Sequence, residues 1–369
     1  MKRLRVMTVV GTRPEVIKLS RVLAALREHT DHVLVHTGQN YAYELNGIFF
    51  KELGIPRPDA FLGAAGATAS ETVGRVIAKV DTLLAKLRPD ALLVLGDTNS
   101  ALAVYPAKRR KVPVFHMEAG NRSFDERVPE EINRRIVDHL SDINLVYTEH
   151  ARRYLLREGI RPETVIKTGS PMREVLEHYR AKIDAAGVLR RLGLEPKGYL
   201  VASAHREENV DAPERLERLL GALEAVAKRF RRPVLFSTHP RTRKRLGPGR
   251  RKGHVAFLEP LGFPDYVKLQ ENALCVLSDS GTLTEEASIL GFPGVMLREQ
   301  HERPEGMDEG SVIMAGLDPE RVLQAVDLAT VRGAPPRPPV DYAPSNVSSK
   351  VVRIVVSHVD YVQRTVWRR

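Results

Sequence analysis

The sequence predicts an α/β fold built from two doubly wound domains that face each other across a cleft. From Leu4 onward, apolar β-branched runs alternate with longer segments of helical periodicity, which is typical of βα units stacked into a parallel sheet. The alternation occurs twice, with a charged helical stretch near residues 170–195 as the linker. At 369 residues and 43% hydrophobic composition, the chain is long enough to bury two cores.

The first half begins with a strand and a helix that opens at Pro14. Proline is favoured in the first turn of a helix, and apolar residues recur at helical spacing as far as Leu26. Strands are expected in this half at residues 5–10, 32–36, 91–95, 112–116, 143–147 and 165–168.

The second half repeats the pattern after a charged helical stretch at residues 173–191. Its expected strands are residues 199–203, 233–237, 255–258, 275–278, 294–297 and 311–314, with helices at 212–230 and 284–290. A proline-rich break at 333–344 precedes a terminal helix, residues 346–367, long enough to pack back on the first domain. The expected domains are therefore residues 1–172 and 173–345, followed by the helical segment 346–369.

The number and distribution of charged residues indicate which kinds of partner to expect. A net charge of +11 would suit nucleic acid, a membrane surface or an anionic small ligand. Because the basic residues lie in short scattered clusters without interleaved aromatics, we expect no nucleic-acid partner. The N-terminal residues run directly into a strand, with no apolar stretch suited to a signal peptide or a membrane span, so we expect a cytoplasmic protein without a membrane partner.

Neither thiol nor metal chemistry is expected. The single cysteine, Cys275, lies within an apolar run and is predicted to be a buried core thiol rather than a nucleophile. The histidines and acids match no zinc spacing, so we expect no metal site.

Carboxylates cluster after the strands of the first half. Asp97 and Glu118 follow two apolar strands, and Glu130 lies in the first turn of a helix that opens with Pro129. Ligands of open α/β sheets bind outside the carboxyl ends of the strands, where converging carboxylates could act as acids and bases. The alternative is that Asp97 and Glu118 cap helices and that Glu130 is a solvated first-turn residue.

Polar residues that suit phosphate follow the strands of the second half. Ser280-Gly281-Thr282 opens a helix that carries Glu285 and Glu286, so backbone amides and hydroxyls could bind phosphate while one glutamate holds ribose. An ordinary Ser/Thr helix cap explains the same residues. Neither a G-x-G-x-x-G nor a P-loop pattern occurs, which disfavours dinucleotide oxidoreductases and P-loop NTPases.

Four further residues could contact a diphosphate or transfer a proton. Arg13 and Lys18 flank the first strand-to-helix loop and could pair with phosphate, or simply be surface charges of the helix. His205 and His239 follow strands of the second half, where they could be acids, bases or phosphate donors, or structural histidines.

Together, these motifs resemble the non-hydrolysing UDP-N-acetylglucosamine 2-epimerases, a family with the GT-B architecture of two Rossmann-like domains. The resemblance covers nearly the whole chain, in order, through Gly11-Thr12-Arg13-Pro14-Glu15 with Lys18, Gly96-Asp97-Thr98, Glu118-Ala119-Gly120, Pro129-Glu130-Glu131 with Asn133-Arg134, His205-Arg206, Asp279-Ser280-Gly281, Glu285-Glu286 and Glu302-Arg303-Pro304-Glu305.

The resemblance implies C2 epimerisation of a UDP-2-acetamido sugar through elimination and re-addition of UDP, with UDP-N-acetylglucosamine to UDP-N-acetylmannosamine as the default. It implies a cytoplasmic homodimer that supplies cell-surface polysaccharide precursors without metal or cofactor. By motif matching, the catalytic residues are Asp97, Glu118, Glu130 and His205; the UDP contacts are Arg13, Lys18, His205, Arg206, His239, Ser280, Gly281, Thr282 and Glu286; and the sugar-side residues are Asn121, Arg122, Asn133 and Arg134.

Departures from the family pattern leave the substrate open. Gln39-Asn40-Tyr41 and His205-Arg206-Glu207-Glu208 differ from family motifs associated with an allosteric UDP-N-acetylglucosamine pocket. Gly96-Asp97-Thr98-Asn99-Ser100 and the segment 116–124 look closer to the branch that forms UDP-N-acetyl-L-fucosamine from its talose epimer. A GT-B glycosyltransferase with an external acceptor and a non-catalytic sugar-nucleotide sensor are the remaining alternatives.

Overall fold

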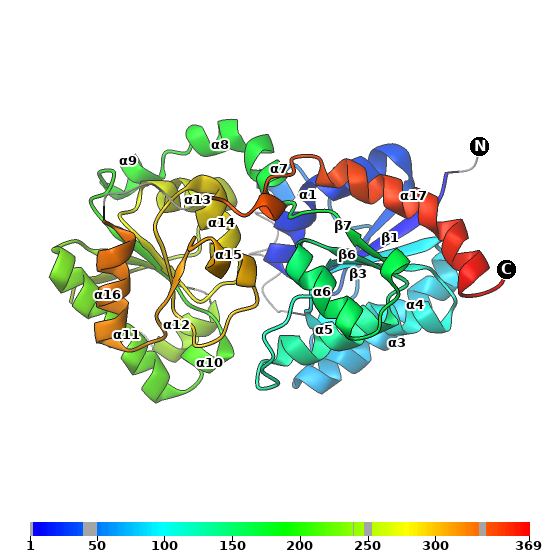
Figure 1. Ribbon diagram of the computed structural model, residues 1–369, viewed down its shortest axis with the longest axis horizontal. Coiled ribbons are helices and arrows are strands. Elements are labelled where there is room, and N and C mark those ends of the chain that lie inside the picture. The colour runs from blue at the N-terminus through cyan, green and yellow to red at the C-terminus, as the bar shows by residue number, and fades with distance from the viewer. Residues whose placement is uncertain (1–2, 40–49, 239, 247–252, 332–336) are drawn as a thin grey trace. The chain divides into compact units, whose positions relative to one another are not determined.

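The computed structural model describes residues 3–39, 50–238, 240–246, 253–331 and 337–369, which form two compact units (Figure 1). Unit 1 comprises Met1–His178 and Asp341–Arg369, and unit 2 comprises Tyr179–Val340. The sequence placed the boundaries after residues 172 and 345 instead. They move because helix α7 (Met172–His178) packs on α1 (Arg13–His29), and because Asp341 accepts hydrogen bonds from the Glu149 backbone N–H and Lys167 Nζ, both at 2.9 Å.

Unit 1 contains a seven-stranded parallel sheet. Its spatial order is β3 (Ala60–Phe61), β2 (Asp31–His36), β1 (Arg5–Val10), β4 (Ala91–Leu95), β5 (Val114–Ala119), β6 (Ile143–Val146) and β7 (Val165–Lys167). The strand order reverses between β1 and β4, which is the topological position at which doubly wound sheets bind ligands. Leu95 of β4 pairs with Met117 of β5, so the loops that carry Asp97 and Glu118 begin side by side.

Helices cover both faces of this sheet. α1, α7 and α17 (Val347–Thr365) pack together, and α3 (Ala69–Leu87), η1 (Asn99–Ala103), α4 (Val104–Arg109) and α5 (Pro129–Leu140) form a second group (Figure 1). The remaining elements of the unit are α6 (Glu149–Arg157), η2 (Pro162–Thr164) and η3 (Val340–Tyr342), the last of which begins at the unit boundary.

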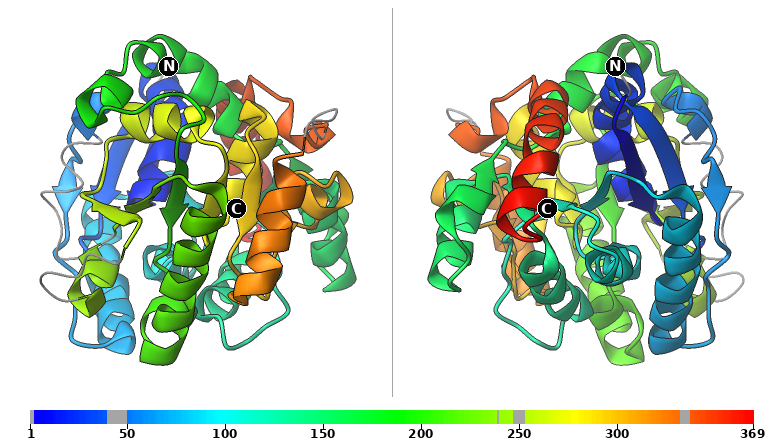
Figure 2. Two further views of the ribbon diagram at one scale, coloured as in Figure 1. Left: turned by 90° about the vertical axis from the view of Figure 1, so that its left-hand side faces the viewer. Right: turned by 90° about the vertical axis from the view of Figure 1, so that its right-hand side faces the viewer.

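Unit 2 contains a six-stranded parallel sheet with helices on both faces. Its order is β10 (Val255–Leu258), β9 (Val234–Ser237), β8 (Leu200–Ser203), β11 (Val276–Ser278), β12 (Gly294–Met296) and β13 (Ile313–Met314). The helices are α8 (Arg180–Asp184), α9 (Val188–Leu192), α10 (Glu207–Val210), α11 (Pro213–Phe230), α12 (Pro240–Leu246), α13 (Phe263–Asn272), α14 (Thr282–Leu290), α15 (Pro304–Asp308) and α16 (Pro319–Ala329). α11 and α16 lie side by side (Figure 2, left).

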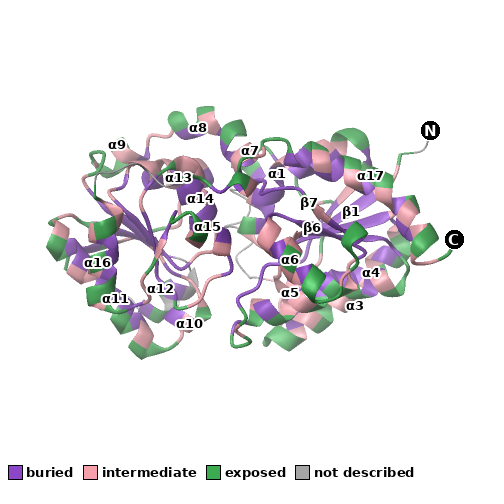
Figure 3. Cartoon of the chain, in the orientation of Figure 1, coloured by how far each residue is buried: buried purple, intermediate pink, exposed green. Residues whose placement is uncertain are grey.

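Apolar residues fill the space between sheet and helices in each unit, as the buried strands in Figure 3 show. The Cys275 thiol is fully buried in the core of unit 2, and burial raises its pKa to about 12. It is therefore a neutral core residue at physiological pH, as expected. Among the described residues, no helix has the length and apolar character needed to cross a membrane.

The terminal helix α17 (Figure 2, right) is held to the rest of unit 1 by a stripe of buried valines. Val355 is fully buried, while the next residue, Val356, is 48% exposed. We expect Val355→Ala to lower the free energy of unfolding of unit 1 by about 2 kcal/mol through lost burial and an unfilled cavity. Val356→Ala should change it little. Urea unfolding followed by the fluorescence of Trp367, the single tryptophan, measures both. Equal losses would contradict anchoring through this face.

Candidate active site

Glu118 occupies a distorted position at the end of β5. The pairing of β5 with β6 shifts register between Met117 and Ala119, which marks a bulge, and Glu118 has a backbone φ of +63°. A positive φ is costly for a residue with a Cβ, and bulges re-aim side chains at functional sites. The bulge therefore changes the direction of the Glu118 side chain at the end of β5.

A buried lysine contacts this carboxylate. Lys18 Nζ, from the second turn of α1, lies 2.6 Å from Glu118 Oε2 and 5.7 Å from the centroid of the Tyr147 ring. The Lys18 side chain is 4% exposed and the Glu118 side chain 12%. The lysine ammonium group is therefore buried, while part of the Glu118 carboxylate stays accessible to solvent.

Asp97 has a similar arrangement with a buried arginine. Arg134 of α5 donates from Nε to Asp97 Oδ2 at 2.9 Å, and its Nη2 donates to the same oxygen. Asn133 Nδ2 donates to the Asp97 carbonyl at 3.0 Å. Two donors from one helix therefore fix the backbone and the side chain of Asp97, which keeps 18% exposure.

The two adjacent glutamates at the start of α5 differ in their surroundings. Glu131 is fully buried; it accepts hydrogen bonds from the Ser123 backbone N–H at 2.9 Å and from Arg134 Nη1 at 3.2 Å. Glu130 is partly exposed in the first turn. Glu131 is therefore a packing residue, and Glu130 is the one whose carboxyl solvent can reach.

Of the four predicted sugar-side residues, Asn133 and Arg134 contact Asp97, whereas Asn121 and Arg122 contact other residues. Asn133 donates to Asp97 and to Asn99 Oδ1, whereas Asn121 is buried and its carbonyl accepts from Arg122 and Arg134. The Arg122 guanidinium is buried against Asp138 and Glu158, with donor–acceptor distances of 2.6 to 2.8 Å. These contacts hold the loop after β5 against α5 and the residue after α6, so within unit 1 Arg122 has a structural role.

Glu15 is a buried carboxyl to which sequence reasoning gave no role. Its Oε2 accepts from the Gly11 and Thr12 amides at 3.0 and 2.6 Å and from Thr12 Oγ1 at 2.7 Å, while Thr98 Oγ1 donates to Oε1 at 3.2 Å. Burial raises its pKa to about 7, against the opposing effect of these hydrogen bonds. The spacing of Thr12 and Glu15 is that of a capping box, which was the available signal.

The Glu15 carboxyl thus occupies the amides at the start of α1, and Lys18 on the same helix is paired with Glu118. Arg13, at the first helical position, is partly exposed. Of the two predicted diphosphate contacts on α1, Lys18 has a carboxylate partner within its own unit.

In unit 2, a buried aspartate organises the loop that carries His205. Asp279 accepts from the backbone N–H of His205 at 3.1 Å and of Arg206 at 3.0 Å, and its Oδ1 lies 3.4 Å from His205 Nδ1. The His205 side chain remains 40% exposed. Asp279 belongs to the motif Asp279-Ser280-Gly281, but the sequence alone predicted no role for it.

The start of α14 has the features expected of an anion-binding helix terminus. Gly281 at the N-cap has no side chain to cover the first amides, and a Cβ there would meet nothing closer than 3.8 Å. Ser280 Oγ and Thr282 Oγ1 lie 3.0 Å apart beside it. Ser280 Oγ accepts from the Thr282 backbone N–H at 3.4 Å, so an uncharged hydroxyl meets the first amide of the helix.

Glu286 and Arg206 are two further predicted UDP contacts for which the structure gives partners. Glu285 is fully buried and paired with Arg303 at 3.0 Å, whereas Glu286 is partly exposed and accepts from Gln270 Nε2 at 2.8 Å. Glu286 is thus the accessible member of the pair. Arg206 Nη2 lies 3.6 Å from Glu302 Oε1, and His239 lies outside the described residues.

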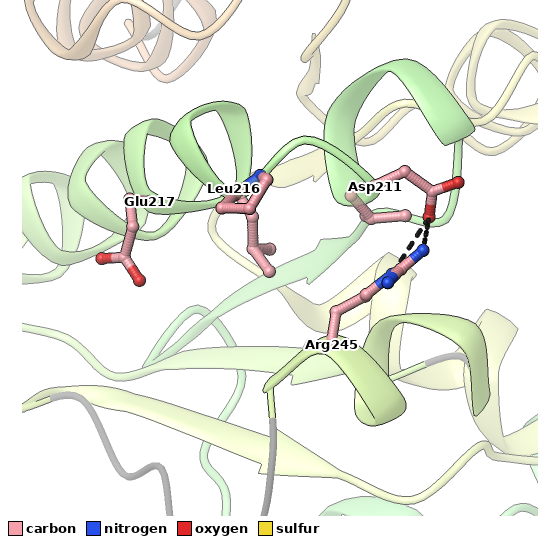
Figure 4. A pocket seen from close by; sticks show the side chains of 6 residues that line it. Asp211, Leu216, Glu217 and Arg245 are labelled. Atoms are coloured by element: carbon pink, nitrogen blue, oxygen red, sulfur yellow. Dashed lines mark hydrogen bonds and ion pairs between the residues drawn. The ribbon is translucent and has the colours of Figure 1, made fainter.

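A small cavity of about 170 Å³ in unit 2 contains none of the predicted site residues (Figure 4). Asp211 and Arg245 form an ion pair of 3.4 Å at its edge. Over the described ranges of the chain, no group of three or more His, Cys, Asp or Glu residues could hold a metal ion.

Comparisons with known proteins decide the family. The family model described as UDP-N-acetylglucosamine 2-epimerase matches residues 24–356. The chain belongs to this family. A Methanocaldococcus jannaschii UDP-N-acetylglucosamine 2-epimerase is 35% identical over 87% of this chain and 90% of its own length. A Pseudomonas aeruginosa UDP-2,3-diacetamido-2,3-dideoxy-D-glucuronate 2-epimerase is also 35% identical, over 87% and 91%.

Solved structures agree with this assignment. A UDP-N-acetylglucosamine 2-epimerase from Rickettsia bellii matches with 52% identity and a TM-score of 0.92, covering 100% of both chains. The M. jannaschii enzyme in complex with UDP-GlcNAc and UDP matches with 32% identity and a TM-score of 0.90, over 96% of this chain and 100% of that one. The predicted family and the GT-B class with two parallel α/β units are confirmed.

The raised pKa of Glu15 predicts pH-dependent stability. The folded carboxyl has a pKa of about 7, against an ordinary glutamate pKa of 4.5, so the free energy of unfolding falls as pH rises through this window and stays lower above it. Glu15→Gln is neutral throughout. We expect its advantage over the unsubstituted protein to grow by about 2.5 kcal/mol between pH 5 and 9.

Urea unfolding monitored by Trp367 fluorescence measures this difference at each pH. Glu28→Gln, an exposed glutamate at the end of the same helix, is the matched control and should give a difference independent of pH. A pH-independent difference for Glu15→Gln would contradict the prediction.

Proposed function

We propose that this protein epimerises C2 of a UDP-2-acetamido-2-deoxy sugar, with UDP-N-acetylglucosamine to UDP-N-acetylmannosamine as the default reaction. Two ordered and partly exposed carboxylates at neighbouring strand ends, Asp97 and Glu118, are the observation that carries the proposal. Each is held by a buried cation of its own unit. Such a pair suits removal of a proton from one face of a carbon and its return on the other.

The proposed reaction has two halves that mirror each other. A carboxylate removes the C2 proton, the C1–O bond breaks, its electron pair leaves with UDP, and a 2-acetamidoglycal remains bound. UDP then re-adds at C1 while a proton is delivered to the opposite face of C2. We assign the acid, base and cation-stabilising roles to Asp97, Glu118 and Glu130, and expect no metal or cofactor.

We assign the UDP contacts mainly to unit 2. The start of α14 at Ser280, Gly281 and Thr282, which carries hydroxyls and no charged side chain, supports phosphate binding, and the accessible Glu286 supports a ribose contact. His205 and Arg206, whose loop is fixed by a buried aspartate, are proposed to contact the leaving phosphate. His239 belongs to the same proposed set.

In unit 1, the contacts change two assignments. Lys18 pairs with Glu118, which supports a role in orienting that carboxylate, and Arg13 is left as the proposed UDP contact of α1. Arg122 is proposed to hold the loop after β5 in place through Asp138 and Glu158. Asn121, Asn133 and Arg134 keep their proposed place on the sugar side.

The sugar is the open part of the proposal. The Rickettsia bellii structure, 52% identical to this chain, is named for UDP-N-acetylglucosamine and supports the default. Two relatives that are each 35% identical are named for different UDP sugars, so similarity at that level does not select one. The UDP-N-acetyl-L-fucosamine-forming reaction is the alternative substrate, and acceptor-dependent glycosyl transfer the alternative reaction. A cytoplasmic homodimer and a role in polysaccharide precursor supply complete the proposal.

Proton NMR in deuterated water tests the reaction. Incubation with UDP-N-acetylglucosamine, and separately with the 6-deoxy-L-talose sugar nucleotide, should replace the C2 hydrogen with deuterium as the 2-epimer forms. The sugar that exchanges faster identifies the substrate. UDP release that requires an added acceptor, without exchange, would instead support a glycosyltransferase.

Glu118→Gln should lower the exchange rate by about 10²-fold or more, because the amide cannot take up the C2 proton. UDP affinity, measured by calorimetry, should stay nearly unchanged, since the proposed UDP contacts lie mainly in unit 2. Glu126→Gln, with a side chain 74% exposed, is the matched control and should keep full activity. Unchanged exchange in Glu118→Gln would remove this residue from the mechanism.

A further inference from the structure

A buried ionic cluster that the proposed chemistry does not use lies beneath the ends of β4 and β5. Its centre is His116 of β5 and Asp138 of α5, both fully buried, with Nδ1 of the histidine 2.9 Å from Oδ1 of the aspartate. Arg122 Nη1 donates to the other oxygen, Asp138 Oδ2, at 2.6 Å. Burying charged groups costs stability, so a buried ionic cluster is weak evidence for stabilisation and raises the question of what else it does.

The cluster contacts the backbone on both loops that carry the proposed catalytic carboxylates. His116 Nε2 lies 2.8 Å from the carbonyl oxygen of Gly96, the residue before Asp97. The backbone N–H of Gly120, two residues after Glu118, donates to the Asp138 carboxylate at 3.1 and 3.2 Å. One histidine–aspartate pair thus connects the loop after β4 to the loop after β5.

A third connection runs through Asn121. Its carbonyl accepts from Arg122 Nη1 at 2.8 Å and from Arg134 Nη1 at 3.0 Å, and Arg134 is the residue that holds Asp97. Glu131, Arg134 and Asp138 are all buried and follow one another at helical spacing along α5. This stripe of α5 therefore contacts both loops at once.

Donor and acceptor roles fix the protonation of the pair. A carbonyl oxygen only accepts, so His116 Nε2 carries a hydrogen. Burial alone would raise the pKa of Asp138, but the hydrogen bonds and positive charges of His116 and Arg122 outweigh it and lower the pKa below its ordinary value. Oδ1 of the ionised Asp138 faces Nδ1 at 2.9 Å, so the histidine meets the Gly96 carbonyl through one ring nitrogen and the aspartate through the other.

We propose that His116 and Asp138 are positioning residues that set the separation of Asp97 and Glu118 by connecting the two loops. The inference rests on the proposed epimerase function, to which it adds residues that touch neither sugar nor UDP. Directional bonds to Gly96 and Gly120 hold the two carboxylates at the spacing that the two proton transfers require. Misplacement of reacting groups by about 1 Å can cost on the order of 10²-fold in rate.

Two substitutions separate the two bonds of the histidine. Asn can place its amide nitrogen near the position of Nδ1, keeping the donor to Asp138 and losing the one to Gly96. Gln can place its amide nitrogen near the position of Nε2, which keeps the donor to the Gly96 carbonyl and loses the one to Asp138. We expect both His116→Asn and His116→Gln to lower the rate of C2 hydrogen exchange by about tenfold or more, with UDP affinity changed less than about twofold.

Two control variants distinguish positioning from general destabilisation. His32→Gln replaces a second histidine of the same sheet, whose Nε2 contacts Thr8 Oγ1 at 2.9 Å, and should keep the exchange rate. Val137→Ala removes buried volume from α5 next to Asp138 and should lower the melting temperature without a comparable loss of exchange. Melting temperatures are measured for all four variants.

Exchange rates within twofold of the unsubstituted protein for either His116 variant would overturn the positioning role while leaving the epimerase function intact. A loss of exchange in Val137→Ala as large as in the His116 variants would also overturn it. If the unsubstituted protein exchanges no C2 hydrogen with any UDP sugar tried, the proposed function itself fails and the inference fails with it.

Discussion

The candidate site of unit 1 depends on two ion pairs in which a buried cation holds a partly exposed carboxylate, Lys18 with Glu118 and Arg134 with Asp97. Removing an ammonium or guanidinium group from water is expensive unless a counter-charge lies against it, so each cation requires its carboxylate in place. In turn, each buried cation restrains its carboxylate. Each carboxylate is fixed from the protein side while its remaining surface stays available to a ligand.

The starts of α1 and α14 show how one structural feature is put to opposite uses. Both follow the end of a strand, and both present amides that attract negative charge. At α1 the protein supplies the acceptor itself through the Glu15 carboxyl, whose burial raises its pKa to about 7. At α14 the N-cap is Gly281, which supplies none. The first arrangement ties the loop before α1 to Thr98, and the second leaves room for an external anion.

Much of the fold follows from local sequence, because β-branched runs and helical periodicity mark the strands and helices of both sheets. Strand β3 was missed, since its two residues carry no pattern. The positions of Asp97 and Glu118 at neighbouring strand ends could be predicted, because the strands before them are marked by apolar runs. Their partners could not: Lys18 lies 100 positions from Glu118, and the positive φ of Glu118 depends on a bulge without a sequence signal.

The buried face of α5 shows the limit of reading charge from sequence. Glu131, Arg134 and Asp138 fit the pattern of a solvated helix, yet all three are buried against the strand ends. Hydrophobic contacts would stabilise this face more simply, but they are not directional and would fix the adjoining loops less closely. Hydrogen-bonded charges define both distance and angle. A site that must hold two carboxylates at a set spacing gains from directional bonds, even at a cost in stability of the kind that the buried Glu15 carries.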